Sequence, residues 1–182
     1  IRFTILIAQG EDTKRQECFS GTALLMLLTS IVLTGLLFFP AEPIMRLLGA
    51  RGEILKLSDE YARVIALGAV FQLLATGFVP FIRNMGGASF AMTAMILGFA
   101  TNIFLDYEFV WVLSWGMEGA ALATIIGQAV TMVAAIAYFI VKRVRARLPA
   151  FKKLADLWKN VLRVAVSPFG LTFSPIVTVL LM

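Results

Sequence analysis

The chain has 182 residues, of which 60% are apolar and only 15% charged, and its mean hydropathy is +0.90. Soluble domains carry about 25% charged residues, and apolar runs of about 20 residues are typical of membrane-spanning helices, so a soluble domain is excluded. The net charge of +5 lies in loops between the apolar runs, which indicates membrane topology and argues against nucleic-acid binding. The composition therefore predicts an all-α, polytopic membrane helix bundle.

The apolar runs begin at the first residue. Residues 1–8 are expected to end a spanning helix, and a polar loop follows over residues 9–17. Residues 19–39 form the first complete span, with 21 positions that carry no charge. Because the chain also ends within an apolar run, we expect it to be incomplete at both ends. Three hydroxyl side chains of the first span are expected to bond to carbonyls of their own helix; they are Thr29, Ser30 and Thr34.

A charged connection joins the first span to the second. Within it we expect a short interfacial helix over residues 41–48 and a helical lead-in over residues 53–60. The second span is predicted over residues 61–82. Arg63 lies near its outer end, where a long side chain extends its charge to the membrane interface.

Two spans carry the polar groups on which the functional prediction depends. The span predicted over residues 90–113 contains Asn102 and Asp106, which are four positions apart and therefore share one face of a helix. After a tight turn, the span over residues 119–141 brings Thr124 back to a similar depth. Asp106 and Thr124 each lie about 8–10 Å from the turn at 1.5 Å per residue.

The depth of Asp106 decides between two interpretations. If the span stopped at Leu105, the carboxylate would be solvated, but only 16 residues would remain for the crossing, slightly fewer than the ~17 required. Held in hydrocarbon beside an amide and a hydroxyl, the carboxylate is a candidate proton or cation site. We therefore predict that Asp106 binds a proton or a sodium ion, with Asn102 and Thr124 as the further sodium ligands.

Three uncharged side chains are predicted to line a substrate pathway. Gln128 follows Thr124 by one helical turn on the same face. Gln72 lies inside the 61–82 span, where hydrogen bonding to a neighbouring helix is the alternative role. Met95, inside the 90–113 span, is the third predicted pathway contact.

A basic hydrophilic segment follows over residues 142–164. Apolar side chains recur at helical spacing over residues 150–164, which predicts an amphipathic helix on the membrane surface that binds anionic lipid, or else a solvated linker that only sets topology. We expect residues 1–141 to form membrane helices, residues 142–164 to be a cytoplasmic linker, and residues 165–182 to begin the next span. The eight cations of the linker are Lys142, Arg143, Arg145, Arg147, Lys152, Lys153, Lys159 and Arg163.

The cations are distributed unequally between the two sides of the predicted bundle. Residues 9–17, 83–89 and 142–164 together hold eleven Lys and Arg residues, whereas the opposite loops hold four, nearly matched by acids. The positive-inside rule places the first set in the cytoplasm. The predicted ion site then opens toward the outside.

Four segments resemble one family of transporters. They are Glu60-Tyr61 at the opening of a span, FIRNMGG over residues 81–87, TNIFLD over residues 101–106, and WGMEGAALAT over residues 115–124. The likeness is to the multidrug and toxic-compound extrusion (MATE) transporters, and among these to bacterial members of the Firmicute type. It implies two six-helix lobes, of which this chain would cover the end of the second helix to the start of the seventh.

The resemblance also implies roles for single residues. It places Asn102, Asp106, Thr124 and Tyr61 in the cation site of the first lobe, with a further acid expected on a first helix outside this chain. Many relatives have a proline after the aspartate, but this chain has Tyr107, so we expect an unbroken helix there. The partners implied are small organic cations, membrane lipids and the remainder of the same protein.

The sequence thus predicts a multi-pass plasma-membrane antiporter that exports organic cations in exchange for H⁺ or Na⁺, with no cofactor beyond the coupling ion. A lipid-linked saccharide flippase of the same superfamily would need several cations in its cavity, yet no Lys or Arg lies in the middle of a complete span. A structural membrane subunit would not need Asp106 at depth. A membrane enzyme is disfavoured because the chain has no histidine and one cysteine, Cys18, which also excludes a disulfide framework and a His/Cys metal site.

Overall fold

The computed structural model describes residues 2–150 and 153–164. All regular structure in these ranges is helical. The predicted span over residues 165–182 lies outside the described residues. The elements are α1 (Arg2–Ala8), α2 (Asp12–Phe38), α3 (Ala41–Leu47), α4 (Gly52–Asn84), α5 (Ala88–Asp106), the π-helix η1 (Tyr107–Val112), α6 (Gly116–Val141), and a helix over residues 153–164.

Four helical segments are long and apolar enough to cross a membrane, namely α2, α4, α5 with η1, and α6. They coincide with the four predicted spans, but the helices extend past the apolar runs. Most of the predicted 9–17 loop belongs to α2, which begins at Asp12. Ion pairs stabilise its first turn, with Lys14 Nζ 2.6 Å from Glu11 Oε2 and Arg15 Nη2 2.9 Å from Asp12 Oδ1.

The predicted lead-in and the second span form one continuous helix, α4, of 33 residues. At 1.5 Å per residue this helix is about 50 Å long, so it extends beyond a hydrocarbon core of ~30 Å. In the first half of this helix, Arg63 Nε donates to Asp59 Oδ2 at 2.9 Å, and the guanidinium lies 5.5 Å from the centre of the Phe38 ring. The Arg63 charge is therefore paired within the protein.

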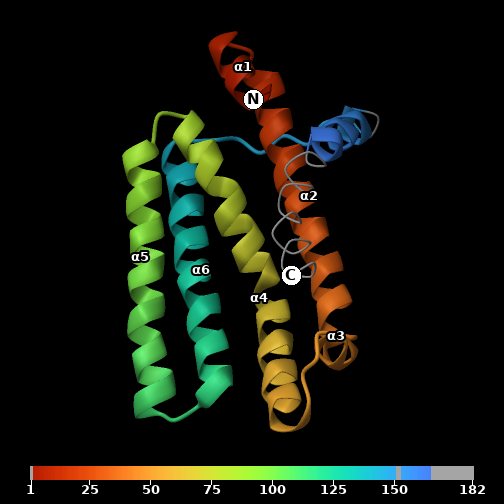
Figure 1. Cartoon of the computed structure of the whole chain (residues 1–182). Coiled ribbons are helices and arrows are strands. Elements are labelled where there is room, and N and C mark those ends of the chain that lie inside the picture. Colours follow the sequence, from red (N-terminus) through yellow and green to blue (C-terminus); the bar gives the residue numbers. More distant parts are fainter. Residues whose placement is uncertain (1, 151–152, 165–182) are drawn as a thin grey trace, which may run out of the picture.

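The long helices form a row in the order α2, α4, α6, α5 (Figure 1). A side-chain hydrogen bond joins the first two, because Thr34 Oγ1 donates to the Ala66 carbonyl of α4 at 2.8 Å. The prediction that Thr34 bonds to its own helix was wrong, since a neighbouring backbone lies within reach of its hydroxyl. Ser30 does bond to its own helix, at the Leu27 carbonyl 2.7 Å away.

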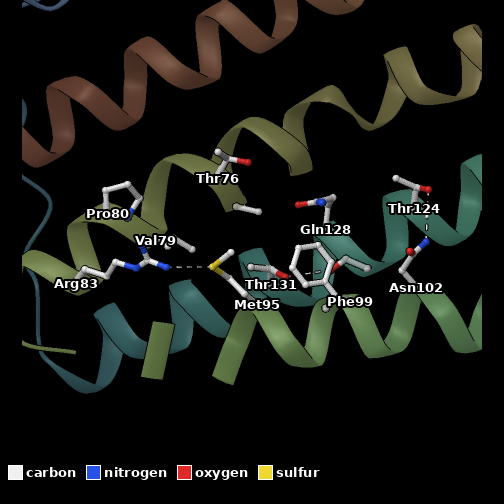
Figure 2. A pocket seen from close by; sticks show the side chains of 13 residues that line it. Thr76, Val79, Pro80, Arg83, Met95, Phe99, Asn102, Thr124, Gln128 and Thr131 are labelled. Atoms are coloured by element: carbon white, nitrogen blue, oxygen red, sulfur yellow. Dashed lines mark hydrogen bonds between the residues drawn. The ribbon is translucent and has the colours of Figure 1, made fainter. Parts of the chain in front are cut away.

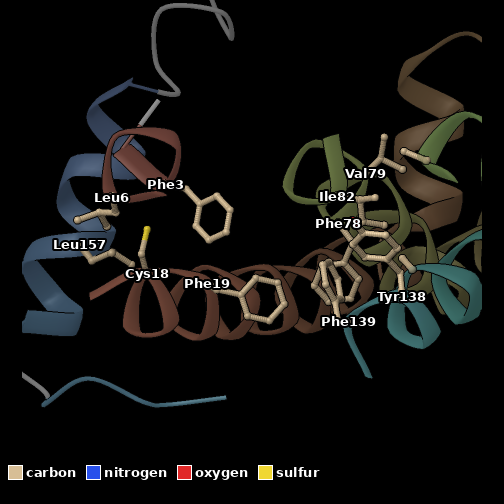
Figure 3. Packing of buried hydrophobic residues seen from close by; sticks show 12 residues of the cluster. Phe3, Leu6, Cys18, Phe19, Phe78, Val79, Ile82, Tyr138, Phe139 and Leu157 are labelled. Carbon is tan, nitrogen blue, oxygen red and sulfur yellow. The ribbon is translucent and has the colours of Figure 1, made fainter. Parts of the chain in front are cut away.

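A cluster of aromatic rings packs α1, the first part of α2 and the last turns of α4 and α6 together (Figure 3). The Phe19 and Phe139 ring centres are 4.8 Å apart, and those of Phe78 and Phe139 are 5.3 Å apart. Ile82 is fully buried beside them. Elsewhere large apolar side chains such as Ile103 and Ile140 are exposed, as expected of surfaces that face lipid.

The helix over residues 153–164 is held against the beginning of α2. Trp158 Nε1 donates to the Gly21 carbonyl at 2.9 Å, and Leu154 and Leu157 are buried. A Cβ atom on Gly21 would lie 3.0 Å from Leu157 Cδ2, so the two helices are in close contact. This part of the amphipathic face covers α2, whereas Leu162 is exposed.

Candidate functional site

Two glycines allow a close approach of helices α5 and α6. A Cβ atom on Gly98 would lie 2.7 Å from the Gly127 carbonyl oxygen, and one on Gly127 would lie 2.7 Å from the Gly98 carbonyl oxygen. Glycine is therefore required at both positions, because any side chain would overlap the opposing backbone. The contact fixes which side chains meet on the next turn of each helix.

Asn102 and Thr124 meet on that turn. Asn102 Nδ2 donates to Thr124 Oγ1 at 3.5 Å, and Thr124 Oγ1 donates to the Ala120 carbonyl at 3.0 Å. Both side chains are half-buried. Thus the two residues that the sequence places at a similar depth are in contact, although 3.5 Å is at the long limit for a hydrogen bond.

Asp106 is the last residue of α5, one turn beyond Asn102. Its Oδ1 atom is buried and has no hydrogen-bond partner among the described residues. A buried carboxylate oxygen without a donor is destabilising, because burial removes its water without replacing the hydrogen bonds. Asp106 therefore presents an acceptor for a proton or a cation.

The helix changes its hydrogen-bonding register directly after Asp106. We expected an unbroken helix at Tyr107, and the chain does stay helical, but Tyr107–Val112 form the π-helix η1. The Leu113 amide donates to the Glu108 carbonyl five residues earlier, at 2.9 Å. Short π-helical segments are frequent at functional sites because they widen one turn and redirect side chains.

A cavity of about 330 Å³ lies between α4, α5 and α6 (Figure 2). Of the predicted site residues, four line it: Met95, Asn102, Thr124 and Gln128. The remaining lining residues are Ala75, Thr76, Val79, Pro80, Arg83, Gly98, Phe99, Gly127 and Thr131.

Three predicted site residues do not line this cavity, and the first of them is Asp106, one turn beyond Asn102 at the end of α5. Gln72 is exposed on α4, one turn before Thr76, which does line it. Tyr61 is half-buried nearer the start of α4. Gln72 and Thr76 are four residues apart on one face of α4, but only the turn that carries Thr76 reaches the cavity.

Three polar residues at the cavity were not among the predicted site residues, and one of them is Thr76 of α4. Thr131 is buried, and its hydroxyl lies 3.2 Å from the Gly127 carbonyl and 3.4 Å from the Ala94 carbonyl of α5. Arg83, assigned to a loop, belongs to the last turn of α4 and lines one end of the cavity. Its distance from the 101–128 stretch along the chain left no signal for this placement.

Comparison with known proteins identifies the family. The MatE family model matches residues 5–108, more than half of the chain. The chain belongs to the MatE family. It is 33% identical to the multidrug export protein MepA of Staphylococcus saprophyticus over 116 residues. The matched region covers 64% of this chain and 26% of that protein. A MepA from Staphylococcus aureus is 34% identical over 111 residues, or 61% of this chain and 23% of that protein.

Solved structures of MatE relatives have the same arrangement of helices. An inward-facing multidrug resistance MATE family transporter of the MOP superfamily superposes with a TM-score of 0.78 at 29% identity, over 86% of this chain and 37% of that one. A MATE protein in a bent conformation gives a TM-score of 0.77 at 29% identity, over 85% of this chain and 36% of that one.

These likenesses confirm the all-α membrane fold and the predicted resemblance. This MatE chain is a multi-pass plasma-membrane protein, and the curated relatives that it matches are named multidrug export proteins. The chain spans about a quarter of the length of the curated relatives it matches.

Proposed function

We propose that the complete protein exports organic cations in exchange for H⁺ or Na⁺, and that Asp106 binds the coupling ion. The observation that carries the proposal is the buried Asp106 Oδ1, which has no donor among the described residues. Asn102 and Thr124, in contact one turn away, supply an amide and a hydroxyl oxygen, which are hard ligands suited to sodium. Tyr61 is a further member of the proposed site.

The cavity supports the export half of the proposal. It reaches Asn102 and Thr124, so a cationic substrate and the coupling ion would compete for the same end of the α5–α6 interface. Neutralising Asp106 removes its attraction for a bound cation and favours release of that cation. One charge that crosses 100 mV contributes about 2.3 kcal/mol, and a tenfold ion gradient about 1.4 kcal/mol, so one ion can drive substantial export.

The orientation proposed from the basic loops completes this cycle. With residues 9–17, 83–89 and 142–164 in the cytoplasm, Asp106 lies toward the outside, where the coupling ion enters. The first helix and the second lobe would belong to the remainder of the protein.

Substitution of Asp106 tests the proposal. We expect Asp106→Asn in the full-length protein to abolish gradient-driven ethidium efflux from cells, because the amide has nearly the same shape but does not exchange a proton or balance a sodium charge. Membrane insertion should be unchanged, since the substitution removes a charge. Glu118→Gln, at an exposed acid in the first turn of α6, is the control and should retain efflux. Undiminished efflux by the Asp106 variant would rule out this site assignment.

Varying the sodium concentration and the pH separately identifies the coupling ion. If sodium is coupled, Thr124→Val should raise the sodium concentration needed for half-maximal efflux, because it removes one oxygen ligand. If the proton is coupled, the sodium concentration should not change the rate of efflux by the unmodified protein or by Thr124→Val.

A further inference from the structure

Arg83 differs from every other side chain that lines the cavity, because among those described residues it alone carries a charge. Its Nη2 lies 3.7 Å from Met95 Sδ, a weak acceptor (Figure 2). The ion pairs found among the described residues do not include Arg83. The guanidinium therefore faces the cavity without an anionic partner in this part of the protein.

The position of Arg83 makes the cavity electrostatically asymmetric. Arg83 and Met95 lie at one end, and Asn102 and Thr124 lie at the other (Figure 2). Met95 and Asn102 are seven residues apart on α5, which corresponds to about 10 Å along the helix. Asp106 lies one turn beyond Asn102 on α5, further from Arg83. The two ends thus favour opposite charges.

A guanidinium at this end is unfavourable for a substrate that is only a cation, because like charges repel. It is favourable for a carboxylate or phosphate, which Arg binds through two parallel N–H donors. Between the ends, the hydroxyl and amide groups of Thr76, Thr131 and Gln128 and the Phe99 ring suit an amphiphilic aromatic molecule.

We propose that Arg83 forms an oxyanion subsite at one end of the cavity, which binds the carboxylate of substrates that also carry a cationic group. The proposal rests on the proposed export function for its choice of substrate. The cationic group of such a zwitterion points toward Asn102 and Thr124, one turn from the Asp106 carboxylate. Arg83 then sets the preference between zwitterionic and purely cationic substrates.

Two dyes that differ only at the carboxylate test the subsite. Rhodamine 110 has a free carboxylate, and rhodamine 123 is its methyl ester. Binding of each dye to the purified full-length protein is measured by fluorescence anisotropy, which requires no export. We expect Arg83→Gln to lower the affinity ratio of the acid to the ester by about tenfold, the effect of one charge-assisted hydrogen-bonded pair. Arg83→Lys should lower it less, because the charge stays but the paired donors are lost.

The control is Arg145→Gln, which removes an exposed cation outside the cavity and should leave the affinity ratio unchanged. If Arg83→Gln weakens both dyes equally, or neither, the subsite is refuted. Failure of the export proposal is a separate outcome, because it appears as absence of gradient-driven dye efflux by the unmodified protein while the binding ratio still responds to Arg83.

A lipid headgroup is the other source of an oxyanion. The binding ratios are therefore repeated in nanodiscs of phosphatidylcholine alone and with added phosphatidylglycerol. The substrate assignment predicts the Arg83→Gln shift in both membranes. If phosphatidylglycerol abolishes the shift by occupying Arg83, the subsite belongs to anionic lipid and the substrate assignment is overturned.

Discussion

Gly98 and Gly127 control the geometry of the candidate ion site, although neither carries a functional group. Their backbones are in contact, so the side chains one turn away, Asn102 and Thr124, come within 3.5 Å. A methyl group at Gly98 would overlap both the Thr131 hydroxyl and the Gly127 carbonyl. The backbone carbonyl cannot rotate away as a side chain can, so α5 and α6 would have to separate.

We expect Gly98→Ala to destabilise the full-length protein by about 1–3 kcal/mol, the usual effect of overpacking a close contact. Thermal unfolding of the purified protein in detergent measures this loss. Gly35→Ala is the matched control, because Gly35 is also helical but a Cβ atom there meets nothing within 4 Å. Alanine is the better helix former, so the control should be neutral or slightly stabilised. Equal unfolding temperatures for the two variants would contradict the close contact.

At the scale of elements, η1 shows what sequence patterns could not predict. An α-helix and a π-helix can be built from the same apolar residues, and they differ in which carbonyl each amide reaches. The substitution of Tyr107 for the proline of many relatives indicated a continuous helix, which is observed, but it did not indicate the changed register. The wider turn is accompanied by specific packing. The Phe109 ring stacks on the Trp115 ring with centres 5.0 Å apart, and Phe109 also lies in close contact with Gly119 of α6.

The basic linker is the second element whose placement depends on tertiary contacts. The Arg147 amide donates to Ser20 Oγ at 2.9 Å, and Lys153 Nζ lies 3.6 Å from Glu17 Oε2. The hydrogen bond from Trp158 Nε1 to the Gly21 carbonyl is the third contact that holds the linker against α2. The helical periodicity of residues 150–164 predicted an apolar face, but it did not show that α2 would cover part of that face.

Trp158→Phe should loosen this attachment, because it removes the indole donor and keeps an aromatic ring. Losing a hydrogen bond of about 1 kcal/mol raises the detached population about fivefold. Trypsin should therefore cleave the exposed 142–147 segment several times faster, as measured on the purified protein by gel electrophoresis. Trp111→Phe, at an exposed residue of η1, is the control. If both variants are cleaved at the rate of the unmodified protein, Trp158 does not hold the linker.

Across the described residues, hydropathy predicted the four membrane-length helical segments and their order, but not the ends of the helices. An apolar run marks the part of a helix that lies in the membrane. Helices α2 and α4 extend past their apolar runs, because charged residues beyond the runs form ion pairs along the helix, such as Asp12 with Arg15. Asn102 and Thr124 could be related from sequence because two adjacent spans and one turn fix their depths. Arg83 could not be placed at the cavity, since that depends on how α4 packs across α5 and α6.

The distribution of cations in this chain predicts the orientation of its helices in the membrane, and cysteine labelling on cells tests that prediction. In a full-length background without other reactive cysteines, Arg51→Cys replaces an exposed residue before α4, and Arg145→Cys replaces one in the basic linker. A membrane-impermeant maleimide should label Arg51→Cys on intact cells and should label Arg145→Cys only after permeabilisation, because basic loops remain in the cytoplasm. Labelling of both in permeabilised cells is the control. The reverse pattern would turn Asn102, Thr124 and Asp106 toward the cytoplasm, so that the coupling ion would reach Asp106 from the side on which the substrate is collected.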